Sequence, residues 1–319
     1  KAMGGATEFA ADRLQTIRLS STSVSDEQLS HLLGLTGLEK LDLSVTQIGD
    51  LGLRALEGLT SLKDLNLSQT TVSDAGLEKL TRLSRLQVLG LAGTLVEGPG
   101  LAHLSRMTSL IELDLSGTRM ENEFLSHVGK ISGLERLRLS FTDVSDAGMK
   151  NLEGLGNLLV LDLGATDVAD AGLAQIAALT NLRELYLNHT RFSDNGLRAL
   201  KPLQNLERIE LFRTRTGNAG VEALSALKNL AVVKLDYTAV DDKALESLRS
   251  LPRVRELSMD STGVTDSGVP LLKSMATLRA LNLYHTLVTE KGLAELKSSL
   301  PACEIVFDRD SAMPNRRSR

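Results

Sequence analysis

Hydroxyl and carboxyl side chains recur along this chain every 24 residues, so any chemistry they carry would be repeated along its length. The hydroxyl row consists of Thr22, Thr46, Thr70, Thr94, Thr118, Thr142, Thr166, Thr190, Thr214, Thr238, Thr262 and Thr286. The carboxyl row, four residues further on, includes Asp26, Asp50, Asp74, Asp146, Asp170, Asp194, Asp242 and Asp266. The hydroxyl row suggests a catalytic or ice-binding array, and the carboxyl row suggests a calcium-binding site. Calcium takes about six to eight oxygen ligands, however, and this spacing supplies no further ones.

The remaining candidates for catalysis lack partners at a useful spacing. Cys303, the only cysteine, follows Pro301 and Ala302, and no histidine is expected beside it to activate the thiol. Serines, histidines and aspartates follow the repeat, so no catalytic triad stands out. No glycine-rich phosphate loop occurs in the sequence. We therefore expect no enzyme activity, no catalytic residues and no cofactor.

Two histidines, His103 and His127, lie 24 residues apart in a stretch that departs from the repeat. There Gly98-Pro99-Gly100 replaces an Asp-x-Gly pattern, and Phe124 replaces a glycine. The pair permits a two-histidine metal site or a second contact patch, but two ligands alone rarely hold a metal. No metal site is predicted.

The charge balance argues against nucleic acid as a partner. The 319 residues include 36 Lys and Arg against 40 Asp and Glu, a net charge of −4, whereas phosphate binding needs a basic surplus. No apolar run approaches the roughly 18 residues of a membrane span, so no membrane partner is expected. A single cysteine cannot form an internal disulfide, which favours a cytoplasmic protein over a disulfide-capped secreted one.

The elements that position these residues follow from the same period. A frame beginning at Leu14 restarts every 24 residues through Leu278, giving twelve repeats over residues 14–301. With its first residue as position 0, each repeat has apolar residues at positions 0, 3, 5, 10, 15, 18 and 21, except at Thr216 and Ser299. Positions 3 and 5 alternate as in a strand, and positions 15, 18 and 21 have helical spacing. Each repeat is thus a short strand, a turn and a short helix, and the repeats must stack on one continuous core.

This pattern resembles a known repeat family. Repeat three, LKDLNLSQTTVSDAGLEKLTRLSR, fits LxxLxLxxTxVxDxGLxxLxxLxx throughout. It is similar to a leucine-rich repeat over about nine tenths of the chain, with Thr at position 8 in place of the usual Asn or Cys. It is similar to the cysteine-containing (F-box-like) subclass and to bacterial Thr-type repeats. The resemblance implies an α/β fold: a leucine-rich-repeat solenoid (horseshoe) with a parallel β-sheet on its concave face, short helices on its convex face, and proteins as ligands.

The polar rows have structural roles in such a solenoid. The threonines at position 8 are expected to form a hydrogen-bonded ladder between neighbouring turns. The aspartates at position 12 precede the helical spacing and are expected to be helix N-caps. Glycine occupies position 14 in nine repeats, where it is expected to let neighbouring backbones approach closely.

The two ends fall outside the repeat. We expect residues 1–13 to be an N-terminal cap, with a short helix around Phe9, or in part a cloning remnant. Residues 302–307 are expected to be a C-terminal capping strand that protects the open edge. Residues 308–319 are polar and basic and are expected to be a disordered tail.

Aromatic residues gather on one predicted face. Of the nine in the chain, five lie at positions 4, 6 and 7 of repeats 6–12, which should point to solvent from the concave strands. Aromatic and arginine side chains dominate binding hot spots, so we expect a protein to bind there. The rings could instead pack along the sheet and only stabilise it. The predicted partner-binding residues are Phe141, Tyr186, His189, Phe212, Arg213, Tyr237, Tyr284, His285, Arg136 and Arg138.

The sequence therefore predicts a protein-binding scaffold that recognises a protein partner through the concave face of repeats 6–12. The alternative is the substrate-recognition arm of a ubiquitin-ligase-type or effector assembly whose catalytic part lies outside this chain. A repeat-type GTPase activator is disfavoured because no loop presents an obvious catalytic arginine. A designed array is disfavoured by the irregular repeats four, five and nine. A homodimer stays open.

Overall fold

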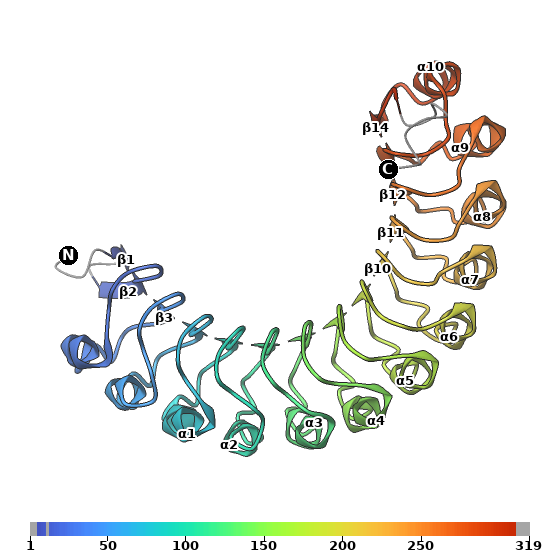
Figure 1. Cartoon of the computed structure of the whole chain (residues 1–319). Helices are drawn as coiled ribbons and strands as arrows, with labels where there is room; N and C mark the ends of the chain where they lie inside the picture. The colour runs from blue at the N-terminus through green and yellow to red at the C-terminus, as the bar shows by residue number, and fades with distance from the viewer. Residues whose placement is uncertain (1–4, 11–12, 311–319) are drawn as a thin grey trace. The chain divides into compact units, whose positions relative to one another are not determined.

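The computed structural model describes residues 5–10 and 13–310. It divides into two compact units, residues 1–162 and residues 163–319, and each is described by itself. Within each unit the strands follow one another in sequence order, and the helical segments lie on the opposite side of each repeat (Figure 1). Of the predicted tail, residues 308–319, the part from 311 to 319 lies outside the described residues.

The sheet of the first unit is built from one short strand per repeat. Its strands are β1 (Ala6–Ala10), β2 (Arg13–Arg18), β3 (Lys40–Asp42), β4 (Asp64–Asn66), β5 (Val88–Gly90), β6 (Glu112–Asp114), β7 (Arg136–Arg138) and β8 (Val160–Asp162). Strands β2 to β8 pair in parallel with a register of 24 residues, as in Leu41 opposite Leu65. Strand β1 pairs antiparallel with β2, so the N-terminal segment is a strand rather than the expected short helix.

The return segments of the first unit are short and largely 3₁₀. They are η1 (Asp26–Leu32), η2 (Gly52–Leu56), α1 (Asp74–Leu77), η3 (Glu78–Arg82), α2 (Leu101–Leu104), η4 (Asn122–Phe124), α3 (Leu125–Val128), α4 (Asp146–Met149) and η5 (Lys150–Leu152). Segments this short gain little from helix propagation, so the apolar side chains that they bury hold them in place.

The second unit repeats the plan with longer α-helices. Its strands are β9 (Glu184–Tyr186), β10 (Arg208–Glu210), β11 (Val232–Lys234), β12 (Glu256–Ser258), β13 (Ala280–Leu283) and β14 (Glu304–Phe307). All of its strand pairs are parallel, and β14 pairs with β13 at the C-terminal end. Its helical segments are α5 (Asp170–Ile176), α6 (Asp194–Ala199), α7 (Asn218–Leu224), α8 (Asp242–Leu248), η6 (Asp266–Gly268), α9 (Val269–Lys273) and α10 (Glu290–Ser299).

Leucines at the predicted apolar positions fill the core of both units. In repeat three, for example, Leu62, Leu65 and Leu67 are fully buried. The two exceptions to the apolar pattern behave differently. Thr216 is fully buried, and its hydroxyl lies 2.8 Å from the hydroxyl of Thr214. Ser299 is exposed at the end of α10, where the long helix carries position 21 away from the core.

The threonines at position 8 do not form the expected ladder. Each hydroxyl donates to the carbonyl three residues earlier in its own repeat, as Thr46 does to Leu43 at 2.6 Å. Backbone groups join neighbouring turns instead: the Val45 N–H, for example, donates to the Ser68 carbonyl at 2.9 Å. The ladder prediction was wrong because the short hydroxyl reaches only the carbonyl of its own turn, while the backbone already pairs across repeats.

The aspartates at position 12 are not helix N-caps. Asp74 is the first residue of α1, and Ser73 before it is the cap, whose hydroxyl accepts from the Ala75 N–H at 3.3 Å. The carboxylate reaches the next repeat: Asp50 accepts from the Ser73 N–H at 2.8 Å and from the Ser73 hydroxyl at 2.6 Å. The aspartate row therefore forms hydrogen bonds between neighbouring repeats, a role that the sequence analysis predicted for the threonines.

Position 7 has a left-handed backbone in all twelve repeats. Glycine occupies two of these positions, Gly93 and Gly117. The others, with φ between 51° and 59°, are Ser21, Val45, Gln69, Phe141, Ala165, His189, Arg213, Tyr237, Ser261 and His285. This conformation is uncommon for residues other than glycine, and the sequence pattern contains no sign of it.

The irregular repeats four and five are a matched pair. Gly98 has φ +135°, and a Cβ there would overlap the ring of Phe124, which occupies position 14 of the next repeat. In regular repeats an aspartate at position 12 packs against a glycine at position 14 instead, as Asp50 does against Gly76. In this pair the glycine is in the earlier repeat and the larger side chain is in the later one, which reverses the regular arrangement.

Candidate partner-binding surface

Four of the predicted residues, His189, Phe212, Arg213 and Tyr237, form one cluster on the sheet side of the second unit, here called the ladder cluster. The ring centroids of His189 and Phe212 are 5.0 Å apart, and those of Phe212 and Tyr237 are 5.3 Å apart, both edge to face. The Arg213 guanidinium lies 5.3 Å from the Phe212 centroid and 5.0 Å from that of Tyr237. Both kinds of contact are favourable, so the four side chains hold one another in place.

The backbone of successive repeats positions this cluster. The His189 N–H donates to the Phe212 carbonyl at 2.8 Å, and the Phe212 N–H donates to the Asn188 side chain at 2.9 Å. The left-handed turns at position 7 direct His189, Arg213 and Tyr237 outward, and all three are exposed. Phe212 lies between them and is half-buried. The rings therefore pack against one another along the sheet, and part of the cluster is still exposed to solvent.

Tyr284 and His285 form a second cluster near the end of the second unit. Their ring centroids are 4.0 Å apart. His285 Nδ1 lies 3.5 Å from Asp260 Oδ1, and His285 Nε2 lies 3.6 Å from Asp308 Oδ2. Within residues 5–10 and 13–310, no ring contact joins this pair to the ladder cluster. Tyr284 and His285 therefore form a ring cluster of their own.

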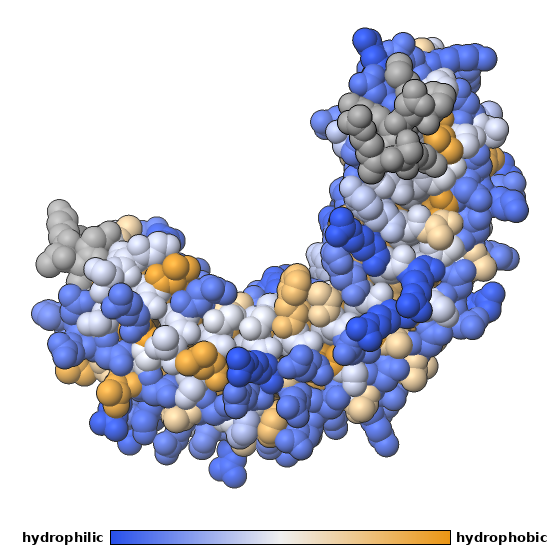
Figure 2. Space-filling view, viewed as in Figure 1, coloured by the Kyte–Doolittle hydropathy of each residue, from blue (hydrophilic) through white to orange (hydrophobic). Residues whose placement is uncertain are grey.

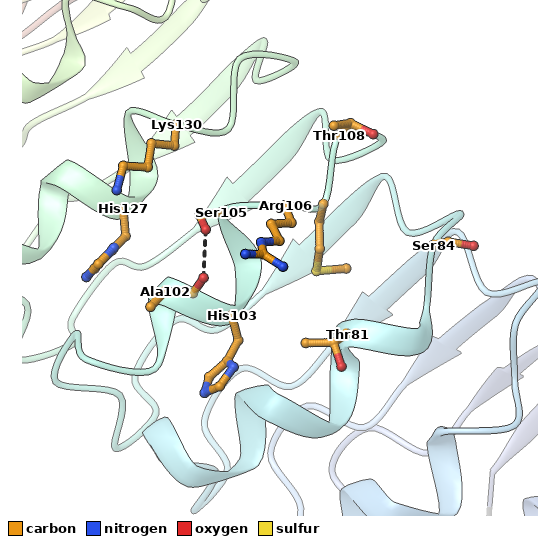
Figure 3. A pocket seen from close by; sticks show the side chains of 10 residues that line it. Thr81, Ser84, Ala102, His103, Ser105, Arg106, Thr108, His127 and Lys130 are labelled. Carbon is orange, nitrogen blue, oxygen red and sulfur yellow. Dashed lines mark hydrogen bonds between the residues drawn. The ribbon is translucent and has the colours of Figure 1, made fainter.

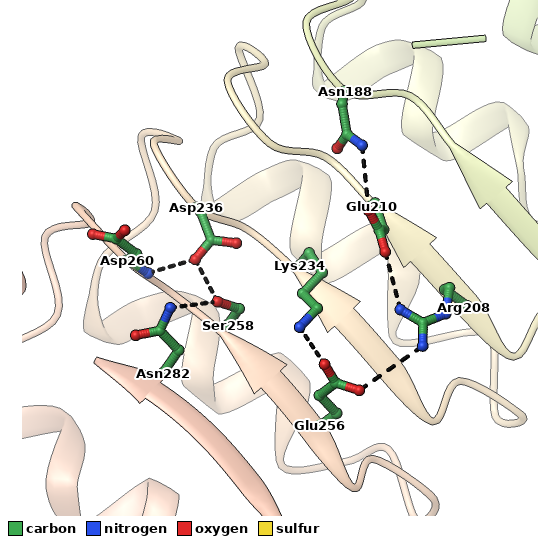
Figure 4. Close-up of polar contacts among 9 residues, drawn as sticks. All are labelled: Asn188, Arg208, Glu210, Lys234, Asp236, Glu256, Ser258, Asp260 and Asn282. Carbon is green, nitrogen blue, oxygen red and sulfur yellow. Dashed lines mark hydrogen bonds and ion pairs between the residues drawn. The ribbon is translucent and has the colours of Figure 1, made fainter. Parts of the chain in front are cut away.

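Ion pairs connect the strands beside the ladder cluster (Figure 4). Arg208 lies 2.9 Å from Glu210 and 3.9 Å from Glu256, which also pairs with Lys234. The hydrogen bond from Lys234 and the nearby positive charges lower the pKa of Glu256 despite its partial burial. Asn188 extends the network to Glu210 at 3.3 Å. Most of these charged side chains therefore pair with one another. The ladder cluster is the part of this surface that remains available to a partner.

Tyr186 is less available than the sequence suggested. It is half-buried, and its hydroxyl donates to Glu184 on the same strand. Burial raises the pKa of the Tyr186 phenol well above its usual value, and the hydrogen bond to Glu184 raises it further. The hydroxyl is therefore occupied by an internal partner.

The remaining predicted residues belong to the first unit. Phe141 is 70% exposed at a left-handed position, and Arg136 is exposed on β7. Arg138 is half-buried and pairs with Glu112 on the neighbouring strand. Phe141 and Arg136 thus present free surface, whereas Arg138 has an internal counter-ion.

The surface around these clusters is mixed rather than uniformly apolar. In Figure 2 hydrophilic residues dominate the visible face of each unit, and apolar residues form small separate spots. Across the part of the chain that the structure describes, no group of three or more His, Cys, Asp or Glu side chains is placed to hold a metal. None of the described helices has the length and apolar character needed to cross a membrane.

Sequence reasoning missed the acidic partners of this surface. Asp236 accepts from the Asp260 N–H at 2.8 Å and from the Ser258 hydroxyl, and Asp260 faces His285. Both aspartates occupy position 6, so the available signal was an acidic residue at the same position of two successive repeats, which the 24-residue parallel register brings side by side.

Comparison with known proteins identifies the class of this repeat fold. A family model described as a leucine-rich repeat region matches residues 97–301, and a second one, described as a leucine-rich repeat, matches residues 35–56 and 58–80. The chain belongs to the leucine-rich repeat family. No curated protein matches the sequence.

Two solved structures show the same fold. The crystal structure of an internalin from Listeria monocytogenes aligns with a TM-score of 0.68 at 19% identity, over 92% of this chain and 86% of the internalin chain. A plant peptide hormone receptor, solved in complex with RGF2, aligns with a TM-score of 0.53 at 16% identity, over 95% of this chain and 52% of the receptor chain. At these identities the likeness concerns the fold alone, which is a leucine-rich-repeat solenoid.

Proposed function

We propose that this protein is a non-catalytic binding scaffold that recognises a protein partner through the sheet side of its C-terminal repeats. The observation that carries the proposal is the ladder cluster, in which Arg213 lies over two aromatic rings and three of the four side chains are exposed. Pre-packed aromatic and arginine side chains lose little conformational entropy on binding, and they dominate the energetics of protein interfaces.

Family membership supports the same proposal. One structural neighbour, the plant peptide hormone receptor, was solved in complex with RGF2, and the other is an internalin. Leucine-rich repeats present a row of parallel strands, and stacked repeats of this kind create extended binding surfaces. In the first unit, Phe141 and Arg136 are also exposed and offer further binding surface.

The test compares capture of partner proteins from the native host's lysate by three folded chains. These are the wild type, a double variant Phe212→Ala with Tyr237→Ala, and a control variant Leu33→Ala with Leu51→Ala. Leu33 and Leu51 are exposed apolar residues beside helical segments. The control therefore removes exposed apolar surface away from the ladder cluster. Circular dichroism establishes that all three chains fold.

We expect the ladder variant to lose the partner and the control to retain it, by quantitative mass spectrometry. Truncation of two hot-spot residues should weaken binding by about 2 kcal/mol or more, which is roughly thirtyfold in Kd. Retention of every partner by the ladder variant, or an equal loss in the control, would refute the proposed surface.

The alternative proposal is that the chain is the substrate-recognition arm of a ubiquitin-ligase-type or effector assembly. The resemblance to F-box-like repeats favours it. Co-purification of ligase components with the full native protein, and their persistence in the ladder variant, would support it, because the catalytic part would attach elsewhere.

A further inference from the structure

Basic side chains occupy two positions of three successive repeats in the first unit. Position 17 holds Lys79, His103 and His127, and position 20 holds Arg82, Arg106 and Lys130. Position 20 is not basic in any other repeat. Positions 17 and 20 lie in the helical segment of each repeat or within two residues of its end, so these six residues form one basic array on the helical side of repeats three to five.

A cavity of about 560 Å³ opens within this array (Figure 3). Its lining comes from three successive helical turns, because α2 packs between η3 and α3. Figure 3 shows His103 and Arg106 on the middle turn, and His127 and Lys130 on the next one. Met107, which is almost fully buried, contributes an apolar wall, and Thr108 contributes a hydroxyl.

The positive charge of this cavity is not compensated. No carboxylate lines it, and within residues 5–10 and 13–310 neither Arg106 nor Lys130 takes part in an ion pair. Two acids of these repeats pair with other cations: Glu78 lies 3.2 Å from Lys79, and Glu97 lies 3.9 Å from Arg119. Two fixed cations and two imidazoles therefore surround open space.

The geometry points to a binding site for a phosphate group, free or as the monoester of a small organic molecule. A guanidinium matches two phosphate oxygens at once, and a lysine ammonium adds a point charge. Imidazole N–H groups and the Thr108 hydroxyl add neutral donors. A volume of about 560 Å³ falls within the range of small-molecule sites, so it leaves room for an organic group beside the phosphate.

This site is independent of the proposed protein-binding surface. It lies on the opposite side of the repeats, in the first unit, and shares no residue with the ladder cluster. Two of its three repeats, the fourth and the fifth, are also the irregular ones, where Gly98 and Phe124 replace the regular aspartate and glycine.

Histidine NMR offers a direct test, because the chain has five histidines and only two of them line the cavity. The full chain is titrated with inorganic phosphate, glucose 6-phosphate and uncharged glucose, and the imidazole carbon–proton signals are followed at constant pH and ionic strength. We expect the phosphates to shift the signals of His103 and His127, while His31, His189 and His285 stay in place. Glucose should shift none. The tighter of the two phosphates identifies whether the free ion or the ester is the ligand.

Two variants test the role of the charges. Arg106→Gln removes a guanidinium from the cavity, whereas Arg82→Gln removes the equivalent charge one repeat earlier, at a residue that does not line it. Because charge-assisted hydrogen bonds are about twice as strong as neutral ones, Arg106→Gln should weaken phosphate binding about tenfold or more. Arg82→Gln should leave it nearly unchanged. Equal shifts in all five histidines, no shift at any concentration up to 50-fold above the protein, or equal weakening by both variants would overturn the inference.

Discussion

The carboxylate of Asp50 occupies the space that a side chain at Gly76 would need. A Cβ on Gly76 would overlap Asp50 Oδ1 and lie 2.8 Å from Leu53 Cδ1. The same relationship recurs between Asp170 and Gly196 and between Asp242 and Gly268. The glycine in one repeat therefore makes room for the aspartate of the preceding repeat, and this close fit helps to join the two repeats.

Gly76→Ala should destabilise the protein. The added methyl group must displace a carboxylate that makes two hydrogen bonds to Ser73, so we expect a loss of about 1–3 kcal/mol in the free energy of unfolding. Urea denaturation followed by circular dichroism measures it. The matched control is Gly58→Ala, where a Cβ would meet nothing within 4 Å and φ is not positive. A control that loses as much stability as Gly76→Ala would contradict this account.

Gly98→Ala should cost stability for two separable reasons. The glycine has φ +135°, which an L side chain rarely adopts, and the new Cβ would overlap the Phe124 ring. Phe124→Ala removes the overlap with the ring, but it leaves the Phe124 Cβ, which the new Cβ would approach to 2.6 Å, and it leaves the backbone strain. In a double-mutant cycle, Gly98→Ala should therefore cost less in the Phe124→Ala background, by about 0.5–3 kcal/mol. Additive effects would show that the two residues do not form a matched pair.

Val45→Asn should stabilise the protein. Val45 has φ 56° and is 53% exposed, and a β-branched residue is poorly suited to this left-handed conformation, whereas asparagine tolerates it. We expect a gain of roughly 1 kcal/mol, measured as an increase in the urea midpoint at an unchanged m-value. Leu95→Asn is the control, because Leu95 is similarly exposed but does not have a positive φ. An equal gain in both variants would trace the effect to lower surface hydrophobicity.

Tyr186 should ionise at unusually high pH. Burial, followed by the hydrogen bond to Glu184, raises the pKa of its phenol above the usual value of about 10. Because the folded state favours the neutral phenol, its contribution to stability is fully present below the unfolded-state pKa. This contribution is lost as the pH rises through the folded-state pKa.

The measurement is the tyrosinate absorbance near 295 nm as a function of pH, taken as the difference between the wild type and Tyr186→Phe. Glu184→Gln should lower the pKa of Tyr186, because a neutral amide no longer repels the phenolate. An ionisation of Tyr186 in the ordinary range in the folded wild type would be inconsistent with the buried, bonded hydroxyl.

The amino-acid sequence by itself determined the repeat, the elements and the core. A strict 24-residue spacing of leucines admits few arrangements, because each repeat must bury positions 3 and 5 on one face of a strand and positions 15, 18 and 21 on one face of a helix. It also located the exposed aromatic residues of the sheet side. Phe141, Tyr237 and Tyr284 are recognisable from their positions in the repeat alone.

Only the tertiary structure decided how polar groups pair between repeats. A repeat pattern says which residues stack, but not which atoms meet. Thr46 bonds within its own turn, while Asp50 bonds to the next one. The left-handed backbone at position 7 arises from the turn that pairs the backbone of adjacent repeats, and residues as different as Val45 and Tyr237 adopt it. The ladder cluster likewise depends on side-chain directions set by these turns, which is why it includes His189 and leaves out Tyr186.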